Sequence, residues 1–329
     1  MIPGMWYAVL ESHEVKKGKP VGVTRMAEKL VFWRDADGKL SCLRDLCAHR
    51  GAQLSAGRII HSHIECPFHG LEYDLSGKCV CIPANGMNSP VPDNFRIFSY
   101  PCREEHGFVW IYWGEGKDFP EEIPFFDDLD DTKFTCVSIA DPWRIHYSRA
   151  IENQLDVVHL PFVHHNTIGR GCKTLVNGPV VRASEKEIAI WVTNAVDEGQ
   201  RPLSQDNIDV AGRTPTVRFM FPNIWQLSVA PNFRIMVAFA PVDNENTVLY
   251  LRTYLSSFRP FAFLVRRFPL IIAHQDRMVV QTQRPKKSSL FMHENLIPGD
   301  RPIVEYRRIR ETLVSRGAVP AEDRQLVIK

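Results

Sequence analysis

The stretch CAHRGAQLSAGRIIHSHIECPFHG, residues 47–70, decides the fold of the N-terminal part of this chain. It contains two cysteines and four histidines, which are residue types that bind soft and borderline metals. Two close pairs lie at its ends: one residue separates Cys47 from His49, and two residues separate Cys66 from His69. Each pair can occupy one tight loop, so two such loops could hold one metal centre between them.

Two thiolates and two imidazoles suit two kinds of metal centre. One is a tetrahedral zinc site, and the other is a 2Fe-2S cluster with thiolates on one iron and imidazoles on the other. Zinc modules more often keep like ligands together, in C-x2-C and H-x3–5-H pairs, whereas each pair here contains one cysteine and one histidine. His61 and His63, between the pairs, are expected to be solvated or hydrogen-bonded loop residues.

The wider pattern resembles the Rieske domain of ring-hydroxylating and demethylating oxygenases. The matching residues are C-x-H-R-G-A-x-L-S-x-G, starting at residue 47, and C-P-F-H-G-x-x-Y-D-x-x-G-K-C, starting at residue 66. The resemblance implies that Cys47, His49, Cys66 and His69 bind a Rieske 2Fe-2S cluster. We expect the other six cysteines to be small buried side chains.

Composition and charge are those of an ordinary globular protein. The chain has 329 residues, of which 44% are hydrophobic and 24% charged, enough for one large domain or two smaller ones. A net charge of +2 without long runs of like charge argues against nucleic acid or a membrane surface as partner. We see no signal peptide, and two arginines interrupt the most apolar stretch, 261–273, which we expect to be a buried helix. These features predict a cytoplasmic protein with reduced cysteines.

Turn residues divide the chain into three parts and predict an α+β protein. Residues 1–114 contain short alternating runs broken by turns, which predicts an all-β domain. Residues 115–131 contain two prolines and eight acidic residues, which predicts a linker. Residues 132–329 are predicted to form an α+β catalytic domain with helices across an antiparallel sheet. Its predicted helices are 142–165 and 259–283, and its predicted strands are 207–222, 224–240 and 246–257.

A second group of metal-binding residue types lies in IENQLDVVHLPFVHH, residues 151–165. On a helix, Asp156 and His159 would share one face, and His164 follows five residues after His159. Two imidazoles suit a mononuclear site with two histidines and one carboxylate, which leaves positions on Fe(II) open for O2 and substrate. Zinc would accept the same ligands but has no redox chemistry. His165 is off this spacing and is expected to be a neighbour, with ligation as a minor alternative.

The same segment resembles the catalytic-iron motif of the Rieske oxygenases, Asp-x2-His-x4-His preceded by Asn153. The resemblance implies a mononuclear Fe(II) held by His159, His164 and a downstream carboxylate on a helix. Asp276 is the candidate inside the predicted helix, although the family usually has an acid where this chain has Gln275. The other downstream acids considered are Asp243, Glu245, Glu294, Asp300 and Glu305.

The resemblance also implies a function, partners and a fold. It implies a terminal oxygenase that takes electrons from a separate, NAD(P)H-fed reductase or ferredoxin, because the sequence has no flavin or nicotinamide fingerprint. With O2 it would hydroxylate, or O- or N-demethylate, a small aromatic or heterocyclic substrate. Family members form head-to-tail trimers, in which Asp156 would connect His69 of one subunit to His159 of the next, so Asp156 and Asn153 are the expected catalytic residues. The implied catalytic fold is helix-grip (START-like).

The chain length and its C-terminal segment resemble the vanillate and dicamba demethylase branch of this family. Three other functions remain open: a ring cis-dihydroxylating dioxygenase, a Rieske electron-transfer protein without oxygenase activity, and a zinc-stabilised binding module. Residues expected to line a substrate pocket come from the predicted strands: Phe219, Phe221, Trp225, Leu227 and Phe239.

Overall fold

The computed structural model describes residues 1–114, 119–130, 134–256 and 267–317. The chain divides into two compact units. The N-terminal unit contains residues 6–113 and 240–243, and the C-terminal unit contains residues 1–5, 114–239 and 244–329. Within the described part of the chain, no helix is both long and apolar enough to cross a membrane.

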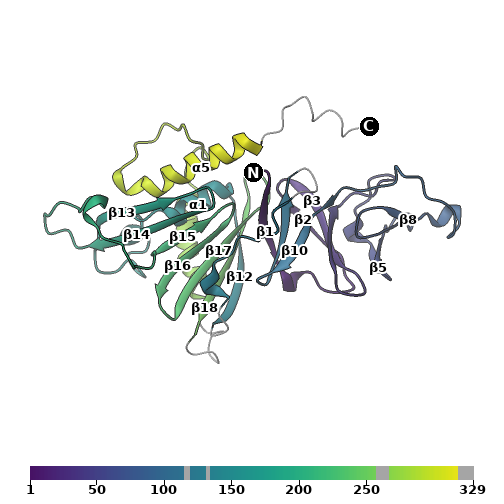
Figure 1. The fold of residues 1–329 in the computed structure, drawn as a ribbon, viewed down its shortest axis with the longest axis horizontal. Coiled ribbons are helices and arrows are strands. Elements are labelled where there is room, and N and C mark those ends of the chain that lie inside the picture. Colours follow the sequence, from purple (N-terminus) through teal and green to yellow (C-terminus); the bar gives the residue numbers. More distant parts are fainter. Residues whose placement is uncertain (115–118, 131–133, 257–266, 318–329) are drawn as a thin grey trace. The chain divides into compact units, whose positions relative to one another are not determined.

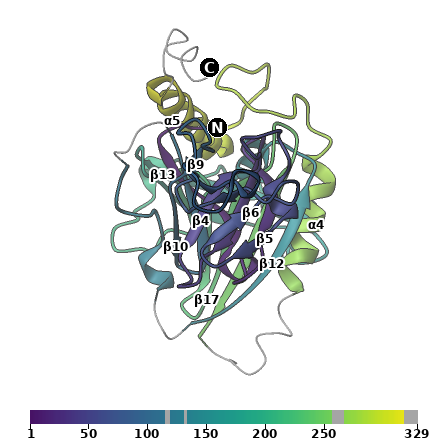
Figure 2. The ribbon, with the colours of Figure 1, turned by 90° about the vertical axis from the view of Figure 1, so that its right-hand side faces the viewer.

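Short antiparallel strands in three sheets build the N-terminal unit (Figures 1 and 2). The first sheet has the order β1 (Met5–Glu11), β11 (Phe108–Trp113), β10 (Cys102–Glu105). The second has the order β2 (Val21–Arg25), β3 (Glu28–Arg34), β4 (Leu40–Arg44), β9 (Ser99–Tyr100). The third has the order β5 (Arg58–Ile60), β6 (His63–Glu65), β7 (Glu72–Tyr73), β8 (Cys79–Cys81). The predicted all-β character of this region is confirmed.

The core of this unit joins the second and third sheets. Trp33 and Leu43, from the second sheet, belong to one buried cluster with Tyr73 from the third. The thiols of Cys47 and Cys66 belong to the same cluster. The two cysteines at the centre of the sequence motif are therefore anchored in the hydrophobic core.

The C-terminal unit is a seven-stranded antiparallel sheet with helices on one face (Figure 1). Along its order, the strands are β12 (Thr135–Trp143), β18 (Thr247–Leu255), β17 (Phe233–Pro241), β16 (Ile224–Ala230), β15 (Val217–Met220), β14 (Glu187–Ala195) and β13 (Leu175–Ala183). The helices are α1 (Tyr147–Leu155), α2 (Leu160–Val163), α4 (Phe268–Val280) and α5 (Arg301–Gly317). This architecture confirms the predicted α+β class.

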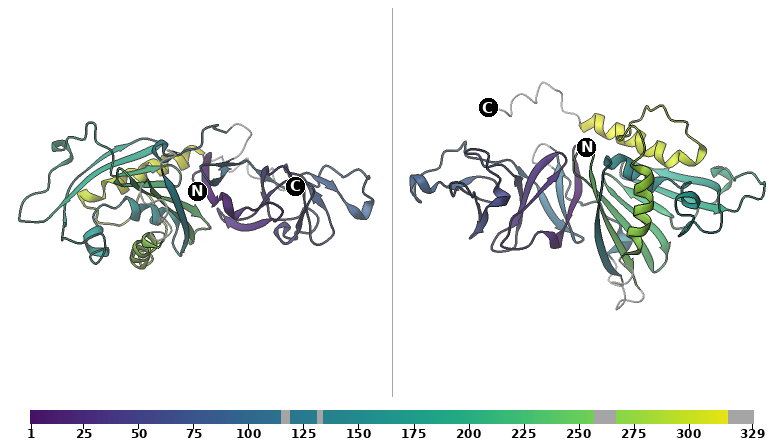
Figure 3. Two further views of the ribbon diagram at one scale, coloured as in Figure 1. Left: turned by 90° about the horizontal axis from the view of Figure 1, so that it is seen from below. Right: turned by 180° about the vertical axis from the view of Figure 1, so that it is seen from behind.

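The helices shield one face of the sheet, as the right-hand view of Figure 3 shows for α4. Helix α4 contacts β18 and α2, α5 contacts β13 and β14, and α1 contacts both α4 and α5. On β16, Trp225 and Leu227 alternate with Gln226, so these two side chains lie on one face of the sheet. Their strand partners on β17 are Val237 and Ile235, which extend the same apolar face toward the helices.

The opposite face of the sheet is covered by part of the acidic segment expected to be a linker. Phe126 is fully buried there, and a 3₁₀ turn follows it at Asp127–Leu129. The Asp128 carboxylate accepts hydrogen bonds from Gln226 and Arg234. These contacts make the segment part of the C-terminal unit.

The secondary structure of the C-terminal unit differs from the prediction in several places. The segment 142–165 is not one helix, because Pro142 pairs in strand β12 and α1 ends at Leu155. Proline is tolerated in β12 because this strand lies at the sheet edge, where a missing N–H need not break the ladder. The segment 224–240 is a hairpin of two strands, and β13 and β14 were not predicted.

Two predictions of burial were also wrong. The stretch 261–273 was expected to be a buried helix, but its described part in α4 exposes 44% of Phe268 and 53% of Ile271, while residues 257–266 lie outside the described part. Of the six cysteines expected to be buried, Cys136 and Cys172 are exposed. A short apolar run does not distinguish a helix that buries one stripe from one that is buried all round.

A buried ion network joins α1 to α5. The Glu152 carboxylate accepts hydrogen bonds from Arg307 Nε at 2.7 Å and from Arg149 Nη1 at 3.0 Å. Glu294 bridges the same two arginines at 2.8–2.9 Å. The side chains of Glu152, Arg149 and Arg307 are at most 5% exposed, so each charge depends on its partners.

We expect Glu152→Gln to lower the free energy of unfolding by about 3 kcal/mol, because two buried guanidinium groups would lose a charged partner. Urea unfolding measures this loss. The matched control is Glu305→Gln, which breaks an exposed pair with Arg308 and should cost less than about 1 kcal/mol. Equal losses in the two variants would contradict a stabilising role for the buried network.

Candidate functional site

Two loops of the N-terminal unit share one backbone design. In each loop, the N–H of the cysteine donates a hydrogen bond to the carbonyl oxygen of the fifth residue after it. The N–H of a glycine four residues after the cysteine donates to the carbonyl oxygen of the cysteine, and all these distances are 2.8–3.1 Å. The cysteines are Cys47 and Cys66, and the glycines are Gly51 and Gly70. Both glycines have positive φ, +74° and +72°, a conformation that favours glycine. The loops therefore present their cysteine and histidine side chains in similar ways.

The four predicted cluster ligands differ in exposure. Cys47 and Cys66 are 3% and 1% exposed, whereas His49 and His69 are exposed. The two imidazole rings lie next to each other, with centroids 4.7 Å apart. This arrangement fits a cluster whose inner iron takes the thiolates and whose outer iron takes the imidazoles.

Tyr73 is a further residue of this region and lies in β7, fully buried. Its hydroxyl lies 3.1 Å from Cys47 Sγ and accepts a hydrogen bond from the Ala48 N–H at 3.2 Å. Burial, followed by the contact with Cys47, raises the pKa of Tyr73 far above its usual value. The neutral phenol can therefore donate its proton to a thiolate at Cys47.

We expect Tyr73→Phe to lower the reduction potential of the cluster, because a hydrogen bond to a ligand sulfur favours the reduced, more negative state. A redox titration followed by circular dichroism measures the midpoint. Iron content and the oxidised spectrum should stay unchanged, which separates tuning from loss of the cluster. An unaltered midpoint would show that the phenol does not donate to the sulfur.

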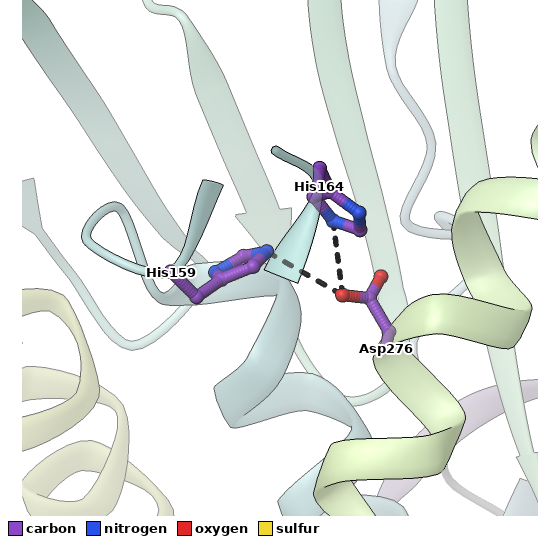
Figure 4. Close-up of side chains that lie close together, drawn as sticks. All are labelled: His159, His164 and Asp276. Carbon is purple, nitrogen blue, oxygen red and sulfur yellow. Dashed lines mark ion pairs between the residues drawn. The ribbon is translucent and has the colours of Figure 1, made fainter. Parts of the chain in front are cut away.

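Three metal-binding side chains meet in the C-terminal unit: His159, His164 and Asp276 (Figure 4). One ligand atom from each lies within 4.8 Å of the others. Asp276 Oδ1 is 3.1 Å from His164 Nε2 and 3.5 Å from His159 Nε2. Asp276 is only 3% exposed, and its Oδ1 makes no hydrogen bond. A buried carboxylate oxygen without a donor is costly, so the three residues fit a bound cation.

The chain positions both histidines with one short helix. Asp156 follows the end of α1 in an extended conformation, and its Oδ1 accepts hydrogen bonds from the N–H groups of Val158 and His159 at 2.6 and 3.2 Å. This side-chain turn starts α2, which has His159 before its first residue and His164 after its last. Asp156 and His159 thus meet across a turn, not along a helix face as predicted.

Each histidine has a polar group near its other ring nitrogen, but only His164 makes a hydrogen bond there. His164 Nδ1 lies 2.9 Å from Gln275 Oε1, which also accepts a hydrogen bond from Thr167 Oγ1 at 3.0 Å. His159 Nδ1 lies 3.6 Å from Asp156 Oδ1. Burial raises the pKa of Asp156, but its contacts with His159 outweigh burial and lower the pKa overall. Both partners leave the Nε2 atoms directed toward Asp276, which is the arrangement a metal requires.

Removing the Gln275 acceptor is expected to weaken metal binding. Without it, nothing selects the His164 tautomer with a free Nε2 lone pair, so Gln275→Leu should raise the Kd for Co(II) about 10- to 100-fold. Calorimetry on protein stripped of its mononuclear metal measures this Kd. Gln275→Glu, which keeps an acceptor oxygen, is the matched control and should bind near the original level. Unchanged affinity in the leucine variant would refute the orienting role.

The other predicted site residues are placed as follows. Asn153 lies on α1 with its Nδ2 buried and unpaired, while its neighbour Gln154 donates to Asp276 Oδ2 at 3.3 Å. His165 Nδ1 contacts the carbonyl of Phe162 at 2.9 Å and does not join the three-residue group. Of the downstream acids considered, Asp276 is the one in that group.

A cavity of about 130 Å³ adjoins the three residues, between the sheet and the helices. Of the five residues expected to line a pocket, Trp225 and Leu227 do so. Phe219 and Phe221 instead pack against Tyr306 of α5, with ring centroids 5.4 and 5.8 Å apart. Further apolar lining residues are Val157, Leu160, Val192, Val217, Ile235, Val237, Leu249, Leu251, Ile272 and Ala273.

Comparison with known families matches each unit separately. Residues 5–101 match the Rieske [2Fe-2S] domain. Residues 143–316, more than half of the chain, match the vanillate O-demethylase oxygenase C-terminal domain. The chain is a member of the Rieske oxygenase family. The predicted 2Fe-2S cluster and mononuclear iron are the cofactors of this family, and the predicted demethylase-type resemblance is confirmed.

Individual relatives include oxygenases and demethylases. Methylxanthine N1-demethylase NdmA of Pseudomonas putida is 27% identical over 92% of this Rieske oxygenase and 86% of its own chain. Dicamba O-demethylase of Stenotrophomonas maltophilia is 32% identical over 48% of this chain and 46% of its own. Chlorophyllide a oxygenase of Chlamydomonas reinhardtii is 34% identical over 50% of this chain, which spans only 25% of that protein.

Solved structures share the fold of this Rieske oxygenase. NdmA of Pseudomonas putida, solved with theobromine as a QL mutant, has a TM-score of 0.78 and 23% identity, covering 95% of this chain and 91% of its own. Dicamba monooxygenase bound to dicamba has a TM-score of 0.76 and 21% identity, covering 96% and 98%. At this level of sequence identity, the structural similarity shows the shared fold alone.

Sequence reasoning assigned no role to Tyr73, Gln154 or Thr167. Tyr73 stood within the quoted motif, and Gln275 stood out as a departure from the family pattern. For Gln154 and Thr167 the sequence offered no such indication, because their contacts with Asp276 and Gln275 join segments more than a hundred residues apart.

Proposed function

We propose that this chain is a terminal oxygenase that demethylates or hydroxylates a small aromatic or heterocyclic compound. The observation that carries the proposal is the apolar cavity that opens on His159, His164 and Asp276. Its overall demethylation would be R–OCH3 + O2 + 2 e⁻ + 2 H⁺ → R–OH + CH2O + H2O. Family membership and the demethylase relatives support this choice over ring dihydroxylation and over electron transfer alone.

The protein's residues would have distinct tasks in this reaction. Cys47, His49, Cys66 and His69 would hold the Rieske cluster, and His159, His164 and Asp276 the mononuclear Fe(II). When bound, the two centres supply one-electron storage and O2 activation. Gln275 and Asp156 would orient the two imidazoles, and the aliphatic cavity wall would hold the substrate beside them and exclude bulk water.

Family membership supports a proposal for the electron donor and the assembly. Rieske oxygenases take electrons from a reductase or ferredoxin and act on aromatic substrates. We propose that the donor here is a separate NAD(P)H-fed chain, and that the protein is a homotrimer in which Asp156 joins His69 of one subunit to His159 of the next.

Turnover with a surrogate reductase tests the proposal. Purified, anaerobically reconstituted protein would be supplied with NADH, reductase and a panel of aromatic methyl ethers and N-methyl heterocycles, while O2 uptake and formaldehyde are measured. We expect formaldehyde in about equal amount to O2 consumed for at least one compound. A cis-diol from an unmethylated arene would favour the dioxygenase, and about two irons per chain without substrate-dependent O2 uptake would favour an electron carrier.

A further inference from the structure

We infer that Gln154 restricts Asp276 to binding the mononuclear metal through a single oxygen, Oδ1, and so leaves one more position on the metal open. Gln154 is a positioning residue, because it acts on the metal through Asp276. The inference rests on the proposed role of His159, His164 and Asp276 as metal ligands and adds how one of them binds. It is carried by the different surroundings of the two carboxylate oxygens.

The two oxygens of the Asp276 carboxylate have different neighbours. Oδ1 lies 3.1 Å from His164 Nε2 and 3.5 Å from His159 Nε2, and it makes no hydrogen bond. Figure 4 shows this one oxygen joined by dashed lines to both imidazole rings. Oδ2 instead accepts a hydrogen bond from Gln154 Nε2 at 3.3 Å. A cation shared by the two imidazoles would therefore meet Oδ1, while Oδ2 already has a donor.

The hydrogen bond from Gln154 opposes rotation of the carboxylate. An ionised carboxylate only accepts hydrogen bonds, so the amide must direct its NH2 group at Oδ2. Binding through both oxygens would require the carboxylate to turn until Oδ2 also pointed at the metal. At 3.3 Å the hydrogen bond is already long, so a turn that carried Oδ2 away from the amide would break it. Hydrogen bonds to charged groups are among the stronger ones in proteins, which makes this loss unfavourable.

Helix α1 holds the amide in a fixed place. Gln154 belongs to the last turn of α1, where Ile151 and Leu155 are fully buried in the core of the C-terminal unit. Glu152 of the same turn belongs to the buried ion network that joins α1 to α5. The backbone that carries the amide therefore cannot shift without disturbing both the core and this network, and a fixed donor of this kind can orient a metal ligand.

One more open position bears directly on the proposed reaction. With two imidazoles and one carboxylate oxygen, an octahedral metal keeps about three positions for water, O2 or a substrate atom. A carboxylate bound through both oxygens would leave about two. Gln154 also lines the cavity, so the residue that restricts Asp276 lies beside the space proposed for the substrate.

Counting the water molecules on the metal tests the inference without turnover. Full-length protein with its cluster oxidised and Mn(II) in the mononuclear site would be studied by electron paramagnetic resonance in ¹⁷O-labelled water, because each bound water broadens the Mn(II) signal. The unaltered protein should show about three waters, and Gln154→Met about two, because Oδ2 loses its donor and turns to the metal. Gln281→Met makes the same change directly after α4 and outside the described cavity wall, and it should keep about three.

A second variant guards against a folding defect in Gln154→Met. Gln154→Leu also lacks a donor but differs in shape, and it should likewise show about two waters. The Kd for Mn(II) should change less than about 10-fold in both variants, since Oδ2 replaces a water on the metal, whereas a merely structural role would weaken binding and leave the water count unchanged.

Two results would overturn the inference alone: about three waters in both Gln154 variants, or about two in the unaltered protein. Either result would leave the ligand assignment and the proposed function standing. If the unaltered protein bound no Mn(II), the assignment of His159, His164 and Asp276 as ligands would fail, and the inference would fail with it.

Discussion

Asp276→Ala is expected to remove the mononuclear iron and lower turnover at least about 100-fold. Asp276 supplies the carboxylate of the described three-residue group. Its Oδ1 lies 3.5 Å from His159 Nε2 and 3.1 Å from His164 Nε2. Two imidazoles alone bind divalent iron weakly and leave its charge uncompensated. Total iron should therefore fall from about three to about two per chain, with the Rieske spectrum intact.

The iron count and the spectrum must be measured together. Glu305→Ala removes another acid of the C-terminal unit, one that is partly exposed and paired with Arg308, and it should retain the full iron content and turnover. If Asp276→Ala kept about three irons and full turnover, the assignment of this carboxylate as a ligand would be wrong. If it lost the cluster spectrum as well, the variant would have a folding defect, which the thermal unfolding midpoint would reveal.

Asp156→Ala is expected to lose nearly all turnover while both metal centres stay loaded. Its Oδ1 lies 3.6 Å from His159 Nδ1 and holds the turn that begins α2. In the proposed trimer the same carboxylate would connect the cluster of a neighbouring subunit to this iron site. Stopped-flow oxidation of the reduced cluster by O2 in the presence of substrate measures the transfer, and it should slow at least about 100-fold.

Asp156→Asn separates the two roles of this residue. The amide oxygen can still accept from the N–H groups of Val158 and His159, so the turn should persist, whereas the negative charge is lost. We expect this variant to be nearly as slow as the alanine variant. Full activity in Asp156→Asn would assign the residue to the turn, and full activity in Asp156→Ala would refute the connection between subunits.

The predictions that depended on short sequence distances agree best with the structure. The two cluster loops could be anticipated because each cysteine, histidine and glycine lies within five residues, and backbone hydrogen bonds inside the loop fix them. Strand β13 was missed because Asn177, Gly178 and Pro179 interrupt its alternation, and the register shifts there. Strand β14 buries Ile188 and Ile190 in a regular alternation that could have been recognised. The single helix predicted across 142–165 fails at its C-terminal half because the Asp156 carboxylate accepts hydrogen bonds from the N–H groups of Val158 and His159, which competes with helical bonding.

The sequence by itself determined which side chains can bind a 2Fe-2S cluster or a mononuclear iron. It also determined the tight turns that present these side chains, since the residues of each turn lie close together along the chain. Only the tertiary structure decided which carboxylate meets His159 and His164, that Gln275 contacts His164, and that Trp225 lines the cavity while Phe219 does not. These pairings join α2 to α4 and the sheet to the helices. Packing of the whole C-terminal unit fixes them, and no local pattern records that packing.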